Sequence, residues 1–310
     1  MNIRFRPLSF SWVAIHPEPK GVILFIGGAF FGTFPTIFYR FFLKSLFEEN
    51  YTIVAIPFRF SFRHWPIAIS LLREQEVLKT QICEAAKQLD YEYEIYQDRQ
   101  NYTWIGHSLG CKYVTLLEFL SDKNWRQNLL NCVDGNEDQI LDITRSLERI
   151  PAEHRSIKDE PSVLISPDIS DTQSAIPKPL ALLARFLDYI KLGVLPTRGQ
   201  TKCFIEHSKL FNLTAIVSFK DDTIAGNKEN TEEDVFWLIE HLKKRRFPLL
   251  HKELNGKHLE PIGVRLGNYI VDLNPFDKFI APLHKRHLET VVVRFLNELQ
   301  QRQSAVARKP

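Results

Sequence analysis

A glycine–serine–glycine turn stands between a strand pattern and a helix pattern near the middle of the chain. Residues 102–105 are aromatic or β-branched, which is typical of a strand, and residues 111–120 place apolar side chains at helical spacing. The intervening residues 106–110 read Gly-His-Ser-Leu-Gly. A sharp strand-to-helix turn lifts a serine hydroxyl clear of its own backbone, and the glycines let strand and helix pack closely. We therefore interpret Ser108 as a candidate nucleophile.

Short apolar runs alternate with helical patterns along most of the chain. The expected strands are 12–16, 22–26, 52–57, 102–105, 162–166, 213–219 and 248–254. The expected helices are 35–49, 66–89, 111–120, 231–244 and 284–300. Strand runs that are apolar throughout are typical of parallel strands covered on both faces. The pattern predicts an α/β protein with a mostly parallel, twisted sheet and helices on both faces.

The chain is expected to form a single domain over residues 1–300. A helical insertion at about 171–212 separates the strand runs 162–166 and 213–219, and we expect it to lie over the strand ends as a lid. Residues 301–310 are interpreted as a flexible C-terminal tail.

Phenylalanine is unusually frequent, with 23 residues in the chain and eight of them between Phe25 and Phe47. No charged residue occurs between Lys20 and Arg40, which is roughly the length of a membrane-spanning helix. Glycines and Pro35 interrupt this stretch, however, and a backbone broken in that way could not satisfy its own hydrogen bonds in lipid. We expect most of these side chains to pack in the core.

The net charge, the N-terminal residues and the cysteines exclude several classes of protein. A net charge of +3 is too small to indicate a nucleic-acid partner. The first residues lack the apolar run and small-residue cleavage site of a signal peptide, so we expect a cytoplasmic protein. Four scattered cysteines without a Cys-x-x-Cys pair predict free thiols, with neither a disulfide framework nor a metal site, and no cofactor is expected.

Four segments together carry a family resemblance. They are Phe-Ile-Gly-Gly-Ala-Phe at 25–30, Phe-Arg-Phe-Ser-Phe at 58–62, Gly-His-Ser-Leu-Gly at 106–110 and Ser-Phe-Lys-Asp-Asp-Thr-Ile-Ala at 218–225. Over roughly residues 10–300 the chain resembles the α/β-hydrolase superfamily, and more closely an uncharacterised branch of it, a domain-of-unknown-function family found in cyanobacteria and plant plastids. The resemblance implies the order nucleophile, acid, base along the chain.

Two neighbouring carboxylates compete for the role of the acid. The resemblance favours Asp222 over Asp221, because Asp-x-Ile-Ala is similar to the acid loop of the family, and both stay open. Asp168 follows the strand run 162–166, where some members of the superfamily place the acid. The resemblance also implies that His258, in a Gly-x-His turn after the last expected strand, is the base.

Further residues are expected around these three. The amide of Leu109 lies at a helix N-terminus and faces the place where an oxyanion would form, and the resemblance implies Ala29, with Phe30 as alternative, as the second donor. We expect Phe30 and Phe31 to give the pocket an apolar wall, and His64 either to line the site or to pack structurally. His107 is interpreted as structural.

These residues favour a serine hydrolase that cleaves an ester or thioester with an apolar part through a Ser-His-Asp triad and an acyl-enzyme. The expected partner is a small-molecule or lipid-like ester. Two alternatives stay open: an inert binding or structural protein on the same scaffold, and an acyltransferase. Peripheral membrane contact is compatible with the first hypothesis, and the sequence leaves substrate identity, chain length and oligomeric state undetermined.

Overall fold

A computed structural model describes residues 2–133, 137–169, 194–272 and 280–307. Its centre is an eight-stranded sheet in the order β1-β2-β4-β3-β5-β6-β7-β8. Strands β3 to β8 run parallel to one another, β2 pairs antiparallel with β4, and β1 and β2 form an antiparallel hairpin at one edge. The strands are β1 Arg6–Leu8, β2 Ser11–Ala14, β3 Gly21–Ile26, β4 Tyr51–Ala55, β5 Tyr102–His107, β6 Ser162–Ile165, β7 Thr214–Phe219 and β8 Leu250–Leu254. The expected α/β class with a mostly parallel sheet is confirmed.

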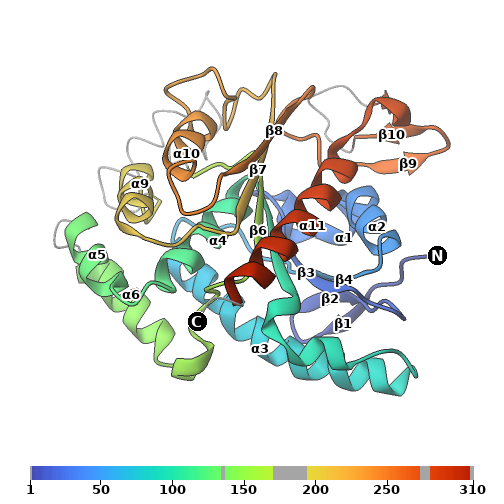
Figure 1. Cartoon of the computed structure of the whole chain (residues 1–310), viewed down its shortest axis with the longest axis horizontal. Helices are drawn as coiled ribbons and strands as arrows, with labels where there is room; N and C mark the ends of the chain where they lie inside the picture. Colours follow the sequence, from blue (N-terminus) through green and yellow to red (C-terminus); the bar gives the residue numbers. More distant parts are fainter. Residues whose placement is uncertain (1, 134–136, 170–193, 273–279, 308–310) are drawn as a thin grey trace.

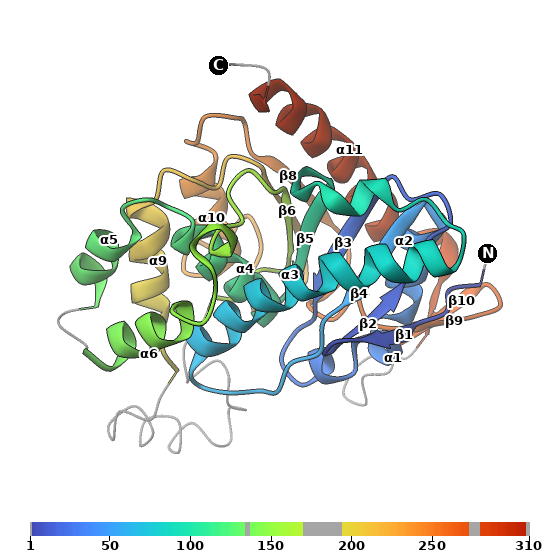
Figure 2. The same ribbon diagram turned by 90° about the horizontal axis from the view of Figure 1, so that it is seen from below.

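Helices cover both faces of the sheet, as Figures 1 and 2 show. α2 and α11 lie on one face, with Phe42 and Leu296 packed against the inner side chains of β3 and β7. α3 and α4 cover the other face, where α9 and α10 also pack. The helices are α1 Pro35–Phe38, α2 Arg40–Glu48, α3 His64–Gln88, α4 Leu109–Leu120, α5 Trp125–Cys132, α6 Glu137–Leu147, α9 Arg198–His207, α10 Asp234–Leu242 and α11 Leu288–Ala307.

The two central strands are buried along their whole length. All six residues of β3 and all six of β5 lie in the core, because helices cover both of their sides. Their parallel pairing, with Ile26 opposite Gly106, brings the C-terminal ends of both strands to the same edge of the sheet. Loops that carry functional side chains meet at this edge.

A second, three-stranded antiparallel sheet was not predicted. It comprises β9 Val264–Leu266, β10 Tyr269–Val271 and β11 Ile280–Pro282. These strands are only three residues long, too short to show an alternating pattern in the sequence. The sheet is attached to the Phe-rich helices, because the amide of Phe41 donates to the carbonyl of Gly263, and the amide of Gly263 donates to the carbonyl of Phe38.

Several helix boundaries differ from the prediction. The single helix expected at 35–49 is divided at Tyr39, which leaves helical geometry between α1 and α2. α10 begins at Asp234 and not at Thr231, since Glu233 has extended backbone geometry, and the Asp234 carboxylate accepts hydrogen bonds from Arg198 and from the amide of Ile169. α11 continues to Ala307, so most of the expected tail extends this helix.

The expectation of free thiols is wrong for two of the four cysteines. Cys132, at the end of α5, and Cys203, in α9, form a disulfide with their Cα atoms 5.7 Å apart. They are 71 residues apart in the sequence, and only the packing of α5 against α9 brings them together. Cys83 and Cys111 are free.

Most of the expected insertion, residues 170–193, lies outside the described residues, and α9 is the helix within its described part. Among the helices that the structure describes, none is both long enough and apolar enough to cross a membrane.

Candidate active site

Ser108 stands at a strained turn between β5 and α4. Its backbone φ of 53° and ψ of −123° are unusual for a residue with a side chain. The neighbouring glycines leave no room for a side chain. A Cβ on Gly110 would lie 2.2 Å from the carbonyl oxygen of Ile26, and a Cβ on Gly106 would lie 2.7 Å from the amide nitrogen of Cys111. The turn therefore needs glycine at both positions.

The next strand holds this turn in place. The amide of Ser108 donates to the carbonyl of Ile165 at the end of β6, over 3.0 Å. The amide of Asp168, just beyond β6, donates to the carbonyl of Ser108 over 3.4 Å. Bonds of this kind from both sides stabilise a conformation that a serine would not adopt alone.

The loops after β7 and β8 bring a carboxylate and an imidazole to Ser108. The Ser108 Oγ and the His258 Nε2 are 2.8 Å apart, and the His258 Nδ1 lies 2.9 Å and 3.1 Å from the two carboxylate oxygens of Asp222. All three residues are buried. The carboxylate can only accept, so His258 Nδ1 carries the proton and Nε2 is free to accept from the serine hydroxyl. This is the arrangement that a general base requires.

Asp222 is held as a carboxylate. Its Oδ1 also accepts hydrogen bonds from the amides of Ile224 and Ala225, over 2.8 Å and 3.0 Å. Burial by itself raises the pKa of Asp222, but the hydrogen bond and charge of His258, together with these two amides, outweigh burial and lower the pKa below its ordinary value.

The structure separates the competing acids. Asp221 is exposed, and its amide donates to the carbonyl of Gly256, so it supports the turn that carries His258. Asp168 lies in the wall of the same cavity as Ser108. Of the three carboxylates, Asp222 is the one hydrogen-bonded to the imidazole of His258.

The loop after β3 comes very close to Ser108. A Cβ on Gly28 would lie 3.0 Å from the Cβ of Ser108 and 3.4 Å from its Oγ, so glycine is needed for this approach. The Gly28 amide is occupied, because it donates to the hydroxyl of Tyr39 over 2.7 Å. Ala29, the next residue, and Leu109 both line the cavity beside Ser108. Their location is compatible with the expectation that the two amides donate to an oxyanion, which stays a prediction.

A buried hydrogen-bonded chain connects this loop to the base. The Tyr39 hydroxyl, which accepts from Gly28, lies 2.8 Å from His107 Nδ1, and His107 Nε2 lies 2.9 Å from the carbonyl oxygen of His258. A carbonyl only accepts, so Nε2 of His107 carries the proton and Nδ1 accepts from the tyrosine. Burial, followed by the charge of His258, lowers the pKa of His107 to about 3, so this imidazole stays neutral.

His107 thus points away from Ser108, as expected, but it contacts the base loop, which the sequence does not reveal. Tyr39 was missed altogether: among so many phenylalanines its hydroxyl gave no sign of a role at the site.

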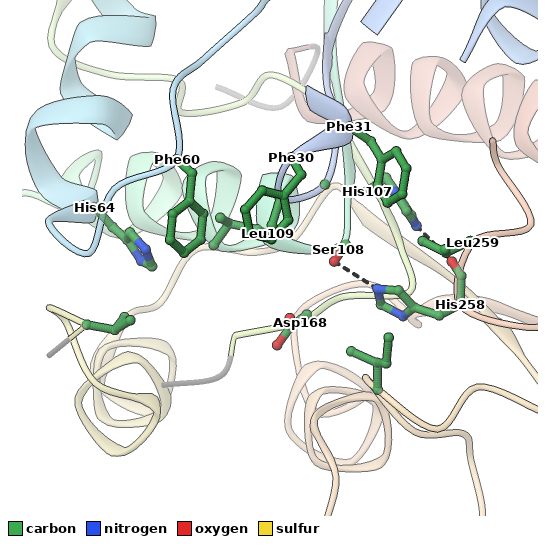
Figure 3. Close-up of a pocket in the computed structure, with 14 residues that line it drawn as sticks. Phe30, Phe31, Phe60, His64, His107, Ser108, Leu109, Asp168, His258 and Leu259 are labelled. Atoms are coloured by element: carbon green, nitrogen blue, oxygen red, sulfur yellow. Dashed lines mark hydrogen bonds between the residues drawn. The ribbon is translucent and has the colours of Figure 1, made fainter. Parts of the chain in front are cut away.

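The cavity beside Ser108 has a volume of about 200 Å³, and its wall includes three phenylalanines. Phe30, 62% exposed, stacks on Phe60 with the ring centroids 5.0 Å apart. Phe31 also lines the cavity and packs edge-on against Phe38. His64 completes the far end (Figure 3). In the sequence Phe60 is only part of a segment that carries the family resemblance, and the structure adds it to the cavity wall.

Potential metal ligands gather elsewhere. Within the described ranges, Cys132, Cys203 and His207 are close enough to share an ion. The two sulfurs are joined to each other, however, and His207 Nδ1 lies 2.9 Å from the carbonyl oxygen of Cys203. In this state the cluster offers no thiolate ligand.

The parallel sheet, the strained serine turn after β5 and the histidine and carboxylate loops after β8 and β7 define the α/β-hydrolase fold class. More particularly, residues 4–151 match the model of a family described as a protein of unknown function, DUF1350. The match confirms the expected resemblance to an uncharacterised branch of the superfamily. It covers just under half of the chain and includes Ser108, while Asp222 and His258 lie beyond it.

Solved structures agree on the fold. A carboxylesterase of Lactobacillus plantarum WCFS1, Cest-2923, is 12% identical, with a TM-score of 0.54 and coverage of 96% of this chain and 98% of that chain. The propionate-bound esterase Est2 of Thermogutta terrifontis is 12% identical, with a TM-score of 0.51 and coverage of 96% and 94%. Comparison with curated proteins finds no sequence match.

Proposed function

We propose that the protein is a serine hydrolase that cleaves an ester or thioester with an apolar part. The observation that supports this best is the hydrogen-bonded series Ser108, His258, Asp222, with contacts of 2.8 Å and 2.9 Å beside an aromatic cavity. The structural relatives, a carboxylesterase and an esterase, are compatible with it.

In the proposed reaction, Ser108 Oγ attacks the carbonyl carbon of the substrate while its proton passes to His258 Nε2. The amides of Leu109 and Ala29 stabilise the oxyanion, and Asp222 stabilises the imidazolium. His258 then gives the proton to the departing alcohol or thiol, which leaves an acyl group on Ser108. A water molecule attacks the acyl-enzyme while His258 takes its proton, and His258 then returns this proton to Ser108 Oγ as the acid is released.

A fluorophosphonate probe tests the nucleophile directly. The wild-type protein should become labelled, and Ser108→Ala should not. Ser218→Ala is a matched control, because the Ser218 hydroxyl also lies 2.9 Å from a histidine, His251 Nε2, but in the regular strand β7 and outside the cavity wall. Equal labelling of Ser108→Ala and wild type would refute the assignment.

Absence of labelling in folded wild-type protein would favour the inert alternative. Where labelling occurs, nitrophenyl esters and acyl thioesters of increasing chain length should be assayed with and without added alcohol acceptors. Release of free acid supports a hydrolase, and acylated acceptor as the main product would indicate an acyltransferase.

A further inference from the structure

His64 is a buried histidine in the cavity wall whose ring makes no hydrogen bond with any residue that the structure describes. It is the first residue of α3 and is only 2% exposed. Neither Nδ1 nor Nε2 makes a hydrogen bond of good geometry with a described residue, although the carbonyl of Ser61 lies near enough to act on the pKa of the ring. Leaving such a group unpaired in the interior costs about 1–3 kcal/mol. An imidazole at this position therefore calls for a partner that binds in the cavity.

Contacts of the backbone and of the ring hold His64 in position, and they do not involve its ring nitrogens. Its amide donates to the carbonyl of Leu195 over 2.8 Å, next to a parallel bridge between Arg63 and Leu195. Its ring packs edge-on against Tyr113 with the centroids 5.4 Å apart. Backbone and packing contacts hold the imidazole, so its ring nitrogens are not needed to fix its position.

The charge state of His64 limits what it can bind. Burial lowers its pKa well below the ordinary value, and the positive charge of Lys112 lowers it further, while the carbonyl of Ser61 opposes this effect. The imidazole is therefore neutral and offers one N–H donor and one nitrogen acceptor. A neutral imidazole pairs with an uncharged group such as a hydroxyl or carbonyl.

The cavity has a reactive end and a second polar end. Figure 3 shows His64 on the side away from Ser108 and His258, with Phe60, Phe30 and Leu109 between them. The stacked rings of Phe30 and Phe60 make the middle of the wall apolar. A volume of about 200 Å³ is below the roughly 300–1,000 Å³ typical of sites for drug-sized ligands. A short acyl chain fits this space.

We propose that His64 is a specificity-determining residue that binds an oxygen on the acyl chain of the substrate, so that the preferred substrates are esters or thioesters of short oxo- or hydroxyacyl groups. The inference rests on the proposed function and narrows its substrate class. The ester carbonyl lies at Ser108, the methylene groups lie along Phe30 and Phe60, and the distal oxygen hydrogen-bonds to His64.

Matched ester pairs test the inference. Nitrophenyl esters of 4-oxopentanoate, 5-oxohexanoate and 6-oxoheptanoate are compared with those of 4-methylpentanoate, 5-methylhexanoate and 6-methylheptanoate, which replace the oxo oxygen with a methyl group. The wild-type protein should prefer at least one oxo ester by about 10-fold or more in kcat/KM, because a site that hydrogen-bonds an oxygen discriminates against an analogue that lacks it. Equal rates across every pair would overturn the inference, even with no variant made.

His64→Phe should remove the preference, so that kcat/KM for each oxo ester becomes equal to kcat/KM for its methyl partner. His64→Gln, which keeps a donor and an acceptor, should restore part of the preference. His251→Phe, at a histidine outside the cavity wall, is the control and should leave the preference intact. A preference that survives in His64→Phe would exclude the role of His64.

Fluorophosphonate labelling separates the two proposals. Labelled protein with no oxo preference refutes the role of His64 and leaves the hydrolase assignment in place. Folded protein that is neither labelled nor active refutes the hydrolase assignment itself.

Discussion

The hydroxyl of Tyr39 and Nδ1 of His107 lie 2.8 Å apart in the core, and this contact joins the two loops on either side of Ser108. This contact connects the Gly28 turn, which lies against Ser108, to the carbonyl of His258. The carbonyl is not the reacting part of His258, so Tyr39 and His107 are positioning residues. They link the position of the His258 loop to that of the Gly28 turn.

Tyr39→Phe is expected to lower kcat/KM for a nitrophenyl ester by about 10-fold, because it leaves the Gly28 amide and the Nδ1 of His107 without a partner in the core. Tyr51→Phe is the control, since the buried hydroxyl of Tyr51 has no hydrogen-bond partner among the described residues. Equal kinetics of the two variants would show that the Tyr39 hydroxyl has no part in positioning.

Two adjacent substitutions distinguish the acids. Asp222→Asn should lower kcat by roughly 1,000- to 10,000-fold, because the amide no longer fixes the tautomer of His258 or stabilises the imidazolium. Asp221→Asn should change kcat less than about 3-fold, since the Asp221 side chain is exposed and acts through its backbone. Steady-state kinetics measure kcat for both variants. A larger loss of kcat in Asp221→Asn than in Asp222→Asn would reverse the assignment.

Phe30→Asn is expected to lower kcat/KM for apolar esters by about 10-fold through loss of the stack on Phe60, with less than about 0.5 kcal/mol lost in unfolding free energy. Phe30 has a positive φ of 63°, and asparagine is the replacement because it occurs at positive φ more often than most residues do. Phe34→Asn is the control, because Phe34 is 57% exposed and lies outside the cavity wall. Urea unfolding and ester kinetics are compared for both variants.

The disulfide closes a loop of 71 residues, so its removal should cost about 2–4 kcal/mol of unfolding free energy. Cys132→Ser combined with Cys203→Ser should show this loss in denaturant titrations, and Cys83→Ser should not. Thiol titration of the unfolded, unreduced protein should detect two thiols, from Cys83 and Cys111. Four thiols in air-purified protein would contradict the disulfide.

Stability should fall as the pH rises past neutrality. Burial, only partly offset by the amide of Phe211, raises the pKa of Glu118 from 4.5 to about 8. The folded state holds this proton more tightly than the unfolded state does, so the contribution is complete below about pH 4.5 and is lost as the pH rises through about 8.

Glu118→Gln keeps an oxygen acceptor for the amide of Phe211. Between pH 5 and pH 9 it should lose up to about 4 kcal/mol less unfolding free energy than wild type. Glu84→Gln, at an exposed helix position, should follow wild type. Identical pH profiles for Glu118→Gln and wild type would rule out this account.

The sequence predicted the features that depend on local pattern. The parallel strands were recognisable from unbroken apolar runs, and Ser108 from glycines that the close packing at Ile26 and Cys111 requires. His258 was placed by its turn after β8. The choice between Asp221 and Asp222 needed the backbone, since neighbouring residues in a turn point in different directions and only one faces the imidazole.

Other features depend on contacts between distant segments and had no local signal. Tyr39 has helical spacing among phenylalanines, and its hydroxyl acquires a role only when α1 and α2 pack beneath the Gly28 turn. Cys132 and Cys203 are paired by the packing of α5 on α9, which depends on the whole helical layer. The strands β9 to β11 are stabilised against α2 and are too short to be recognised alone.

The bonds that hold Ser108 to β6 have a consequence for how the protein reaches its native state. Ile165, which accepts from the Ser108 amide, is separated from it by a long stretch of chain that contains α4, α5 and α6. Contacts between distant segments form late, because closing the intervening loop costs entropy before the contact repays it. Reactivity of Ser108 therefore reports on complete pairing of β5 with β6, and recovery of probe labelling during refolding should lag behind the recovery of helical circular dichroism.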